Sequence, residues 1–259
     1  RLGYGAAHRK PMDDAQRETI LNAALDAGIN YIDTAGCYGN SEELIGRYLS
    51  GRSSEFYLAT KGHTWTKVGL LRSIDDSLRR LKTDYVDVMQ PHNPSVEACE
   101  SGGVVDSLVD MRDQGKVRWI GISTTLPYLP TYLSWGVFDV FQVPYSALER
   151  DHEGWISRAA EAGVGIIIRG GVAKGDPSGE GHGGDSWSRW GKANLDDLLE
   201  GMTKTQFMLR FTITNPDLDT TIIGTASLDH LSDNLKTMEA GPLSADVYDE
   251  AKRRLSGVA

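Results

Sequence analysis

The sequence lacks several features that mark particular classes of protein. Its 259 residues contain no run of about 18 apolar residues, so no membrane-spanning helix is predicted. No basic leader with an apolar stretch and a small-residue cleavage site opens the chain, so we expect no secretory signal. Positive charge is also scarce. The chain has 27 Lys and Arg but 36 Asp and Glu. The resulting net charge of −9 argues against nucleic acid or an anionic membrane as a partner.

Cysteine and histidine are few as well. The two cysteines, Cys37 and Cys99, form no Cys-x-x-Cys pair and no cluster with histidine along the sequence. No bound metal is therefore expected, and this cysteine usage is typical of a reducing compartment, so we expect a cytoplasmic protein. The six histidines are also too few for a metal-dependent barrel hydrolase, which needs several His and Asp ligands at strand ends.

Eight short apolar runs alternate with longer amphipathic stretches along the chain. Short, continuous, β-rich runs are typical of a parallel sheet that is buried on both faces. The runs cover residues 2–6, 30–34, 56–60, 85–90, 117–123, 140–145, 165–169 and 220–224. Between them, residues 14–27 and 67–81 place apolar side chains at helical spacing. Strand and helix repeated eight times predict an α/β protein with a single-domain (β/α)8 TIM barrel over residues 1–259.

An open, doubly wound sheet is the alternative fold. It would usually carry the glycine pattern GxGxxG after its first strand, where it binds a dinucleotide. The first run continues as LGYGAAH in residues 2–8, which does not supply that pattern. The barrel is therefore favoured over the open sheet.

A long connection follows the seventh run. Its residues 170–192 are rich in Gly, Ser and Trp, and we expect them to form a loop at the C-terminal rim of the barrel. Such a loop is either a functional flap or a mobile segment, and the tryptophans Trp187 and Trp190 within it favour a flap. Together with Trp65 and Asn93, they are candidates for an aromatic, partly polar substrate pocket.

Four polar residues lie around the ends of the second, third and fourth runs: Asp33, Tyr38, Lys61 and His92. Active sites of (β/α)8 barrels lie at the C-terminal ends of the strands, so these side chains are expected to meet. A phenol of pKa about 10 can protonate a substrate oxygen when an ammonium group favours its anion, a carboxylate keeps the ammonium charged and an imidazole polarises the carbonyl. Taken singly, each residue has another explanation, as a helix cap, a rim aromatic, a solvated lysine or a turn histidine. Their joint occurrence indicates proton transfer at an alcohol or carbonyl oxygen.

The motifs around these residues resemble those of the aldo-keto reductases. DTAGCYGNSE (33–42), LATK (58–61) and DYVDVMQPHNP (84–94) are followed by IGIS, FQVPYS and IIGTASLDHLSDNL, in the order and at spacings similar to that family over nearly the whole chain. The resemblance implies metal-free reduction of a small-molecule carbonyl substrate with a nicotinamide cofactor, NADP(H) or NAD(H). It implies no oligomeric state.

The resemblance also implies roles for individual residues. Tyr38 would be the general acid, Lys61 would lower its pKa, Asp33 would pair with Lys61, and His92 would orient the substrate carbonyl. The residues implied to bind the cofactor are Ser123, Thr124, Gln142, Arg169, Gly224, Thr225, Ser227, His230, Asp233 and Asn234. Ser123 and Gln142 match groups that hold the nicotinamide carboxamide, and the turn from Gly224 to Ser227 opens a helix whose N-terminus suits a phosphate.

Three of these positions depart from the family pattern. Thr124 replaces an asparagine, and Arg169 replaces a tyrosine that stacks on the nicotinamide. Arg169 could stack in its place, reach a phosphate or form a salt bridge at the rim. His230 stands where members often have a basic residue for the 2′-phosphate, and no Lys or Arg occurs between Arg210 and Lys236. We therefore expect weak discrimination between NADPH and NADH.

Two classes of function fit these observations. The first is an NAD(P)H-dependent reductase of aldehydes or ketones. The second is a nicotinamide-binding regulatory or sensor subunit with little turnover, which can keep the same four residues. Turnover with a broad aldehyde distinguishes them.

Overall fold

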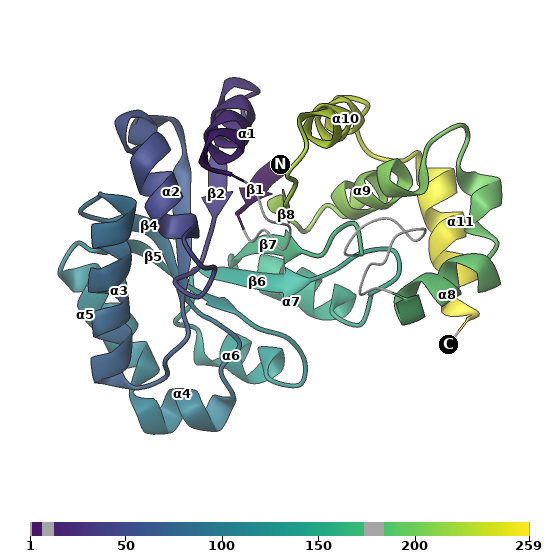
Figure 1. Ribbon diagram of the computed structural model, residues 1–259. Helices are drawn as coiled ribbons and strands as arrows, with labels where there is room; N and C mark the ends of the chain where they lie inside the picture. The colour runs from purple at the N-terminus through teal and green to yellow at the C-terminus, as the bar shows by residue number, and fades with distance from the viewer. Residues whose placement is uncertain (1, 7–12, 174–183, 259) are drawn as a thin grey trace.

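A computed structural model describes residues 2–6, 13–173 and 184–258. Within these residues, eight parallel strands close into a barrel in the order β1 to β8, and helices surround the strands (Figure 1). The strands are β1 (Leu2–Gly5), β2 (Tyr31–Asp33), β3 (Tyr57–Gly62), β4 (Val86–Pro91), β5 (Val117–Ser123), β6 (Val140–Pro144), β7 (Gly165–Arg169) and β8 (Thr220–Ile223). Each coincides with one predicted apolar run to within two residues. The predicted (β/α)8 barrel is confirmed, and the open-sheet alternative is wrong.

The helices begin where the sequence provides side-chain caps. Asp13 and Gln16 form a reciprocal capping box at the start of α1, and the Thr66 hydroxyl accepts from the Gly69 amide at the start of α3. The predicted helices 14–27 and 67–81 are confirmed as α1 and α3. The helices are α1 (Asp14–Asp26), α2 (Ser41–Tyr48), α3 (Lys67–Leu81), α4 (Val96–Gly102), α5 (Val104–Asp113), α6 (Leu129–Trp135), α7 (Glu153–Glu161), α8 (Gly184–Lys192), α9 (Lys204–Thr214), α10 (Leu228–Glu239) and α11 (Ala245–Ser256), with 3₁₀ turns η1 (Ser50–Glu55) and η2 (Leu195–Leu198). None of these helices is long and apolar enough to cross a membrane.

The segment expected as a loop, residues 170–192, is partly helical. Residues 184–192 form α8, while residues 174–183 lie outside the described part of the chain. Trp187 and Trp190 are three residues apart, so they lie on the same side of the helix. Their rings lie 5.5 Å apart, and that of Trp190 meets Phe207 of α9 edge-on at 5.4 Å. The gain from burying these aromatic rings accounts for a helix where the Gly content predicts a loop.

The strands place polar side chains at one end of an otherwise apolar barrel. Every residue of β1 and of β4 is buried, as expected for a parallel sheet with helices outside it. The register pairs Lys61 with Gln90 and Ser123 with Gln142, so polar residues lie at the same height on neighbouring strands near their C-terminal ends. That mouth of the barrel is therefore polar, and it holds the candidate site.

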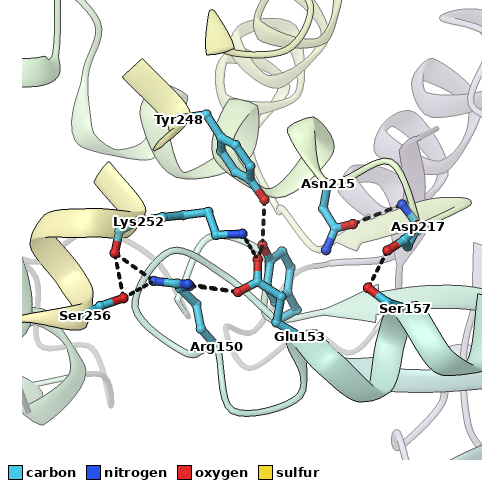
Figure 2. Close-up of polar contacts among 9 residues, drawn as sticks. Arg150, Glu153, Ser157, Asn215, Asp217, Tyr248, Lys252 and Ser256 are labelled. Carbon is cyan, nitrogen blue, oxygen red and sulfur yellow. Dashed lines mark hydrogen bonds and ion pairs between the residues drawn. The ribbon is translucent and has the colours of Figure 1, made fainter. Parts of the chain in front are cut away.

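A polar network ties α11 to the connection between β6 and α7 (Figure 2). Glu153 accepts from Nη2 of Arg150 at 2.9 Å, and its other oxygen lies 2.7 Å from Nζ of Lys252 in α11. Tyr145, which follows β6, donates to Glu153 at 3.1 Å, and its hydroxyl lies 3.1 Å from that of Tyr248. Helix α11 thus holds the segment that follows β6 in place. Strand β6 carries Gln142.

Candidate active site

Asp33 and Lys61 form a buried ion pair between the ends of β2 and β3. The Nζ of Lys61 lies 2.5 Å from Oδ2 of Asp33, and the two side chains are 1% and 2% exposed. Lys61 also donates to the carbonyl oxygen of Thr34 at 2.8 Å. The second oxygen of Asp33 accepts from Nε2 of Gln142 on β6 at 2.8 Å. These hydrogen bonds compensate the pair for its loss of water.

Tyr38 and His92 complete a group of four around this pair. The Nζ of Lys61 lies 5.1 Å from the centroid of the Tyr38 ring. The rings of Tyr38 and His92 meet edge-on at 5.8 Å. A backbone hydrogen bond holds the turn that carries Tyr38. The amide of Tyr38 donates to the carbonyl oxygen of Ala35 at 3.0 Å. The structure therefore brings together the four residues that the sequence singled out.

The protonation states of Tyr38 and His92 follow from their surroundings. Burial raises the pKa of the Tyr38 phenol, Asp33 and Cys37 add to the rise, and Arg169 opposes it. The net shift is upward, because burial and these two groups outweigh the guanidinium of Arg169. Burial, with Lys61 and other cations, lowers the pKa of His92 to about 4. At neutral pH, Tyr38 is a protonated phenol and His92 a neutral imidazole.

Several buried polar groups at this mouth have no partner among the described residues. They are the hydroxyl of Ser123, both amide atoms of Gln90 and Nε of Arg169. Ser123 and Gln90 are fully buried, and Arg169 ends β7. Buried polar groups in native proteins are normally hydrogen-bonded, so such a cluster indicates a site for a polar ligand. Burial lowers the pKa of Arg169, while Glu149, Tyr38 and Asp33 act in the opposite direction.

The remaining residues expected at the cofactor site follow β5 and β8. Thr124 is 1% exposed, and its hydroxyl donates to the carbonyl oxygen of Thr125 at 3.4 Å. Ser227 caps α10, and its hydroxyl accepts from the amide of His230 at 3.4 Å. The following turn of α10 holds Asp233, which accepts from Gln206 at 2.7 Å. The first turns of α10 and the turn that precedes them, Gly224–Ser227, thus contain the expected residues Thr225, His230, Asp233 and Asn234.

The four residues expected at the substrate pocket separate into two groups. Trp65 lies 5.3 Å from His63, and the amide of Asn93 donates to the carbonyl oxygen of Ser123 at 2.9 Å, so both lie near the mouth. Trp190 is 2% exposed, and its indole donates to Asp196 at 3.0 Å. The ring is therefore covered by packing between α8 and α9, and the structure shows no contact between Trp190 and the residues at the mouth that it describes. Trp187 packs against Trp190 and keeps part of its surface exposed.

A family comparison agrees with this geometry. The model of the Aldo/keto reductase family matches residues 1–254. The chain belongs to this family. The matched residues include all eight strands of the barrel and the group of four, Asp33, Tyr38, Lys61 and His92. Membership makes this protein an oxidoreductase of the class that generally acts on carbonyl groups.

Known oxidoreductases resemble this chain over more than half of its length. The aldo-keto reductase AKR11C1 from Bacillus halodurans, in its holo form, has 28% sequence identity and a TM-score of 0.88, covering 98% of this chain and 91% of that chain. Uncharacterized oxidoreductase YqkF of Bacillus subtilis is 26% identical over 257 residues, which are 88% of this chain and 84% of that protein. NADH-specific methylglyoxal reductase of Escherichia coli is 30% identical over 181 residues, 59% of this chain and 55% of that protein.

Sequence reasoning missed Gln90 as a candidate site residue. Gln90 lies beside Lys61 in the strand register, and its position two residues before His92 was the available signal. Sequence reasoning also missed that Cys37 and His63 lie next to His92, with Sγ of Cys37 3.6 Å from Nδ1 of His92. No spacing along the chain indicated this cluster, because its members follow three different strands.

Proposed function

We propose that this aldo-keto reductase reduces an aldehyde or ketone to the alcohol with NADPH or NADH, using Tyr38 as the general acid. The observation that carries the proposal is the contact of Tyr38 with both Lys61, 5.1 Å from its ring, and His92, 5.8 Å away. A protonated phenol, a neutral imidazole and a buried ammonium group thus lie close together. This is the donor set that a carbonyl oxygen needs as negative charge develops on it.

The buried groups without partners support the fit of a nicotinamide ring at the mouth. A carboxamide offers an acceptor oxygen and two N–H donors, which match the hydroxyl of Ser123 and the amide of Gln90. Ser123, Thr124 and Gln142 would hold the carboxamide, and Arg169 would stack on the ring or reach a phosphate. The turn from Gly224 to Ser227, which leads into α10, would take a phosphate at the N-terminus of that helix. When bound, the cofactor supplies a hydride to the carbonyl carbon.

Similarity to a known relative supports the same fit. The holo form of AKR11C1 has a TM-score of 0.88 against this structure and the apo form of that protein 0.82, at the same identity of 28% and the same coverage of 98% of this chain. The arrangement of this barrel is thus nearer to the form of that protein that is titled holo. This likeness supports the proposal that the barrel takes a cofactor.

The residues around the carbonyl would divide the work among themselves. His92 and Tyr38 donate hydrogen bonds to the carbonyl oxygen and orient it. As the oxygen gains negative charge, the proton of the Tyr38 hydroxyl moves to it and leaves a phenolate. The ammonium group of Lys61 stabilises that phenolate, and Asp33 holds Lys61 in place. Solvent then returns a proton to Tyr38.

Turnover with a simple aldehyde tests this proposal. The purified protein is mixed with NADPH or NADH and 4-nitrobenzaldehyde, and oxidation of the cofactor is followed by its absorbance. We expect turnover with at least one cofactor. The variant Tyr38→Phe is expected to lose most of this turnover. Its matched control is Tyr57→Phe at the start of β3, where the residue is 45% exposed, and this variant keeps full activity. Tight cofactor binding without turnover across a panel of aldehydes and ketones would instead identify a sensor subunit.

A further inference from the structure

The ends of β2, β3 and β4 bring one thiol and two imidazoles together beside Tyr38. Cys37 forms no disulfide and is exposed, and its Sγ lies 3.6 Å from Nδ1 of His92. The rings of His63 and His92 meet edge-on at 5.6 Å. One nitrogen or sulfur atom from each of the three residues lies within 4.8 Å of the other two. Carbonyl reduction gives no role to Cys37 or His63.

The spacing of these atoms suits a small tetrahedral metal site. With zinc–sulfur and zinc–nitrogen bonds of about 2.3 and about 2.0 Å, a tetrahedral angle places the two ligand atoms about 3.5 Å apart. The Cys37–His92 pair, at 3.6 Å, already has this separation. A nitrogen of His63 lies within 4.8 Å of both atoms, and its side chain is exposed, so it has room to rotate toward them.

The kind of ligand selects the kind of metal. A thiolate with two imidazoles is a set that Zn²⁺ and similar borderline-soft cations prefer, whereas Mg²⁺ and Ca²⁺ prefer oxygen. Three protein ligands leave a fourth position for water, as in zinc sites that stay open to small molecules. The thiol of Cys37 loses its proton when the metal binds.

The backbone holds the three residues in place. The amide of His92 donates to the carbonyl oxygen of Gly62 at 2.9 Å, directly before His63 in the chain. The amide of Gly36, directly before Cys37, donates to the carbonyl oxygen of Lys61 at 3.1 Å. The connections that follow β2 and β4 are therefore hydrogen-bonded to the end of β3, directly before His63. Little ordering of the chain remains to oppose binding, which favours affinity.

We propose that Cys37, His63 and His92 form a binding site for Zn²⁺ or a similar divalent transition metal, and that metal bound there inhibits carbonyl reduction. The inhibition rests on the proposed function, but the binding does not. A cation bonded to His92 restrains the ring that orients the substrate, and its water occupies space beside Tyr38. Removing the metal with a chelator restores activity, because no covalent bond to the protein changes other than loss of the thiol proton.

Cobalt(II) spectroscopy tests the site without any turnover. Co²⁺ is titrated into the purified protein, and thiolate-to-cobalt charge transfer in the near ultraviolet reports a Cys ligand, while intense visible bands report four-coordination. We expect one Co²⁺ per chain, displaced by one equivalent of Zn²⁺. Cys37→Ser abolishes the charge-transfer band, and His63→Gln weakens Co²⁺ binding at least tenfold. The control is Cys99→Ala, because Cys99 is buried in α4 and this variant leaves the spectrum unchanged.

Inhibition is measured on the same proteins. We expect Zn²⁺ to inhibit aldehyde reduction by the wild type, and EDTA to reverse this. Cys37→Ser and His63→Gln keep their basal activity but need at least tenfold more Zn²⁺ for half inhibition. Absence of the charge-transfer band, or a band that persists in Cys37→Ser, overturns the metal site even if the enzyme reduces aldehydes. A band that disappears in Cys37→Ser supports the site, and if no carbonyl is then reduced without metal, the proposed function alone fails.

Discussion

Lys61 and Asp33 form an ion pair with 2.5 Å between Nζ and Oδ2, and almost no part of either side chain contacts solvent. The pair is completed by the Thr34 carbonyl oxygen on the side of Lys61 and by the Gln142 amide on the side of Asp33. It joins β2, β3 and β6, three strands of the barrel. A pair of this kind stabilises the fold only while both members are present.

Removing one member of the pair should therefore be costly. We expect Asp33→Asn to lower the free energy of unfolding by about 3–5 kcal/mol, because the charge of Lys61 is left buried without a counter-ion. The double variant Asp33→Asn, Lys61→Met should recover most of this loss. Urea unfolding, monitored by circular dichroism, measures both. A loss below about 1 kcal/mol in Asp33→Asn would mean that the pair is solvated.

His92 makes the stability of the protein depend on pH. Burial, with Lys61, His63 and Arg169, lowers its pKa from the ordinary 6.5 to about 4 in the folded state. A protonated His92 thus favours unfolding. The contribution of the neutral ring to stability is complete above pH 6.5 and is lost as the pH falls through about 4.

Two measurements check the behaviour of His92. Titration followed by NMR should find the imidazole neutral at pH 6, and the Tm should fall between pH 6.5 and 4 more steeply in the wild type than in His92→Gln. Equal slopes in the two proteins would contradict the lowered pKa.

The binding site for the cofactor's adenosine end should discriminate weakly between NADPH and NADH. His230 is the basic group at the start of α10, and no Lys or Arg occurs between Arg210 and Lys236. We expect the two values of kcat/KM to differ by less than about a hundredfold, or roughly 2.7 kcal/mol. His230→Arg should raise the preference for NADPH, since an arginine stays charged and can bind a phosphate through two N–H groups. A larger preference in the wild type would place another cation on the 2′-phosphate.

A glycine at the crossing of α2 and α3 tests the packing of the barrel wall. A Cβ on Gly46 would lie 2.2 Å from the backbone oxygen of Arg80 and 2.7 Å from the carbonyl carbon of Leu81. Backbone atoms cannot move aside easily, so Gly46→Ala should destabilise the protein by about 1–3 kcal/mol. The control is Gly154→Ala in α7, where no atom lies within 4 Å and alanine favours the helix. Thermal unfolding of both variants checks this, and equal Tm values would contradict the close approach.

Much of the fold could be predicted, because its signals are local. Strands buried on both faces appear as short apolar runs, and all eight were found to within two residues. The error concerned residues 184–192, where the composition favours a loop and contacts with α9 favour α8. Those contacts join segments that are distant in the sequence, so composition alone could not predict the helix or the burial of Trp190.

The candidate site shows the same division. Asp33, Tyr38, Lys61 and His92 could be named because each lies at or shortly after the C-terminal end of a strand, and the barrel brings these ends together. The upward shift in the pKa of Tyr38 could not be predicted from the sequence, because it depends on how deeply the ring is buried. The cluster of Cys37, His63 and His92 could not either, because it depends on how three connections turn over the mouth.

The most direct test of the account is the effect of Tyr38→Phe on carbonyl reduction. The change removes one hydroxyl and keeps the ring that contacts Lys61 and His92. Cofactor affinity is measured by fluorescence titration and kcat with 4-nitrobenzaldehyde at neutral pH, under metal-free conditions. We expect kcat to fall at least about 100-fold, as general-acid catalysis contributes about 10²–10⁴-fold, with unchanged cofactor affinity. A variant that keeps more than about half of the wild-type kcat would contradict the assignment of Tyr38 as the proton donor.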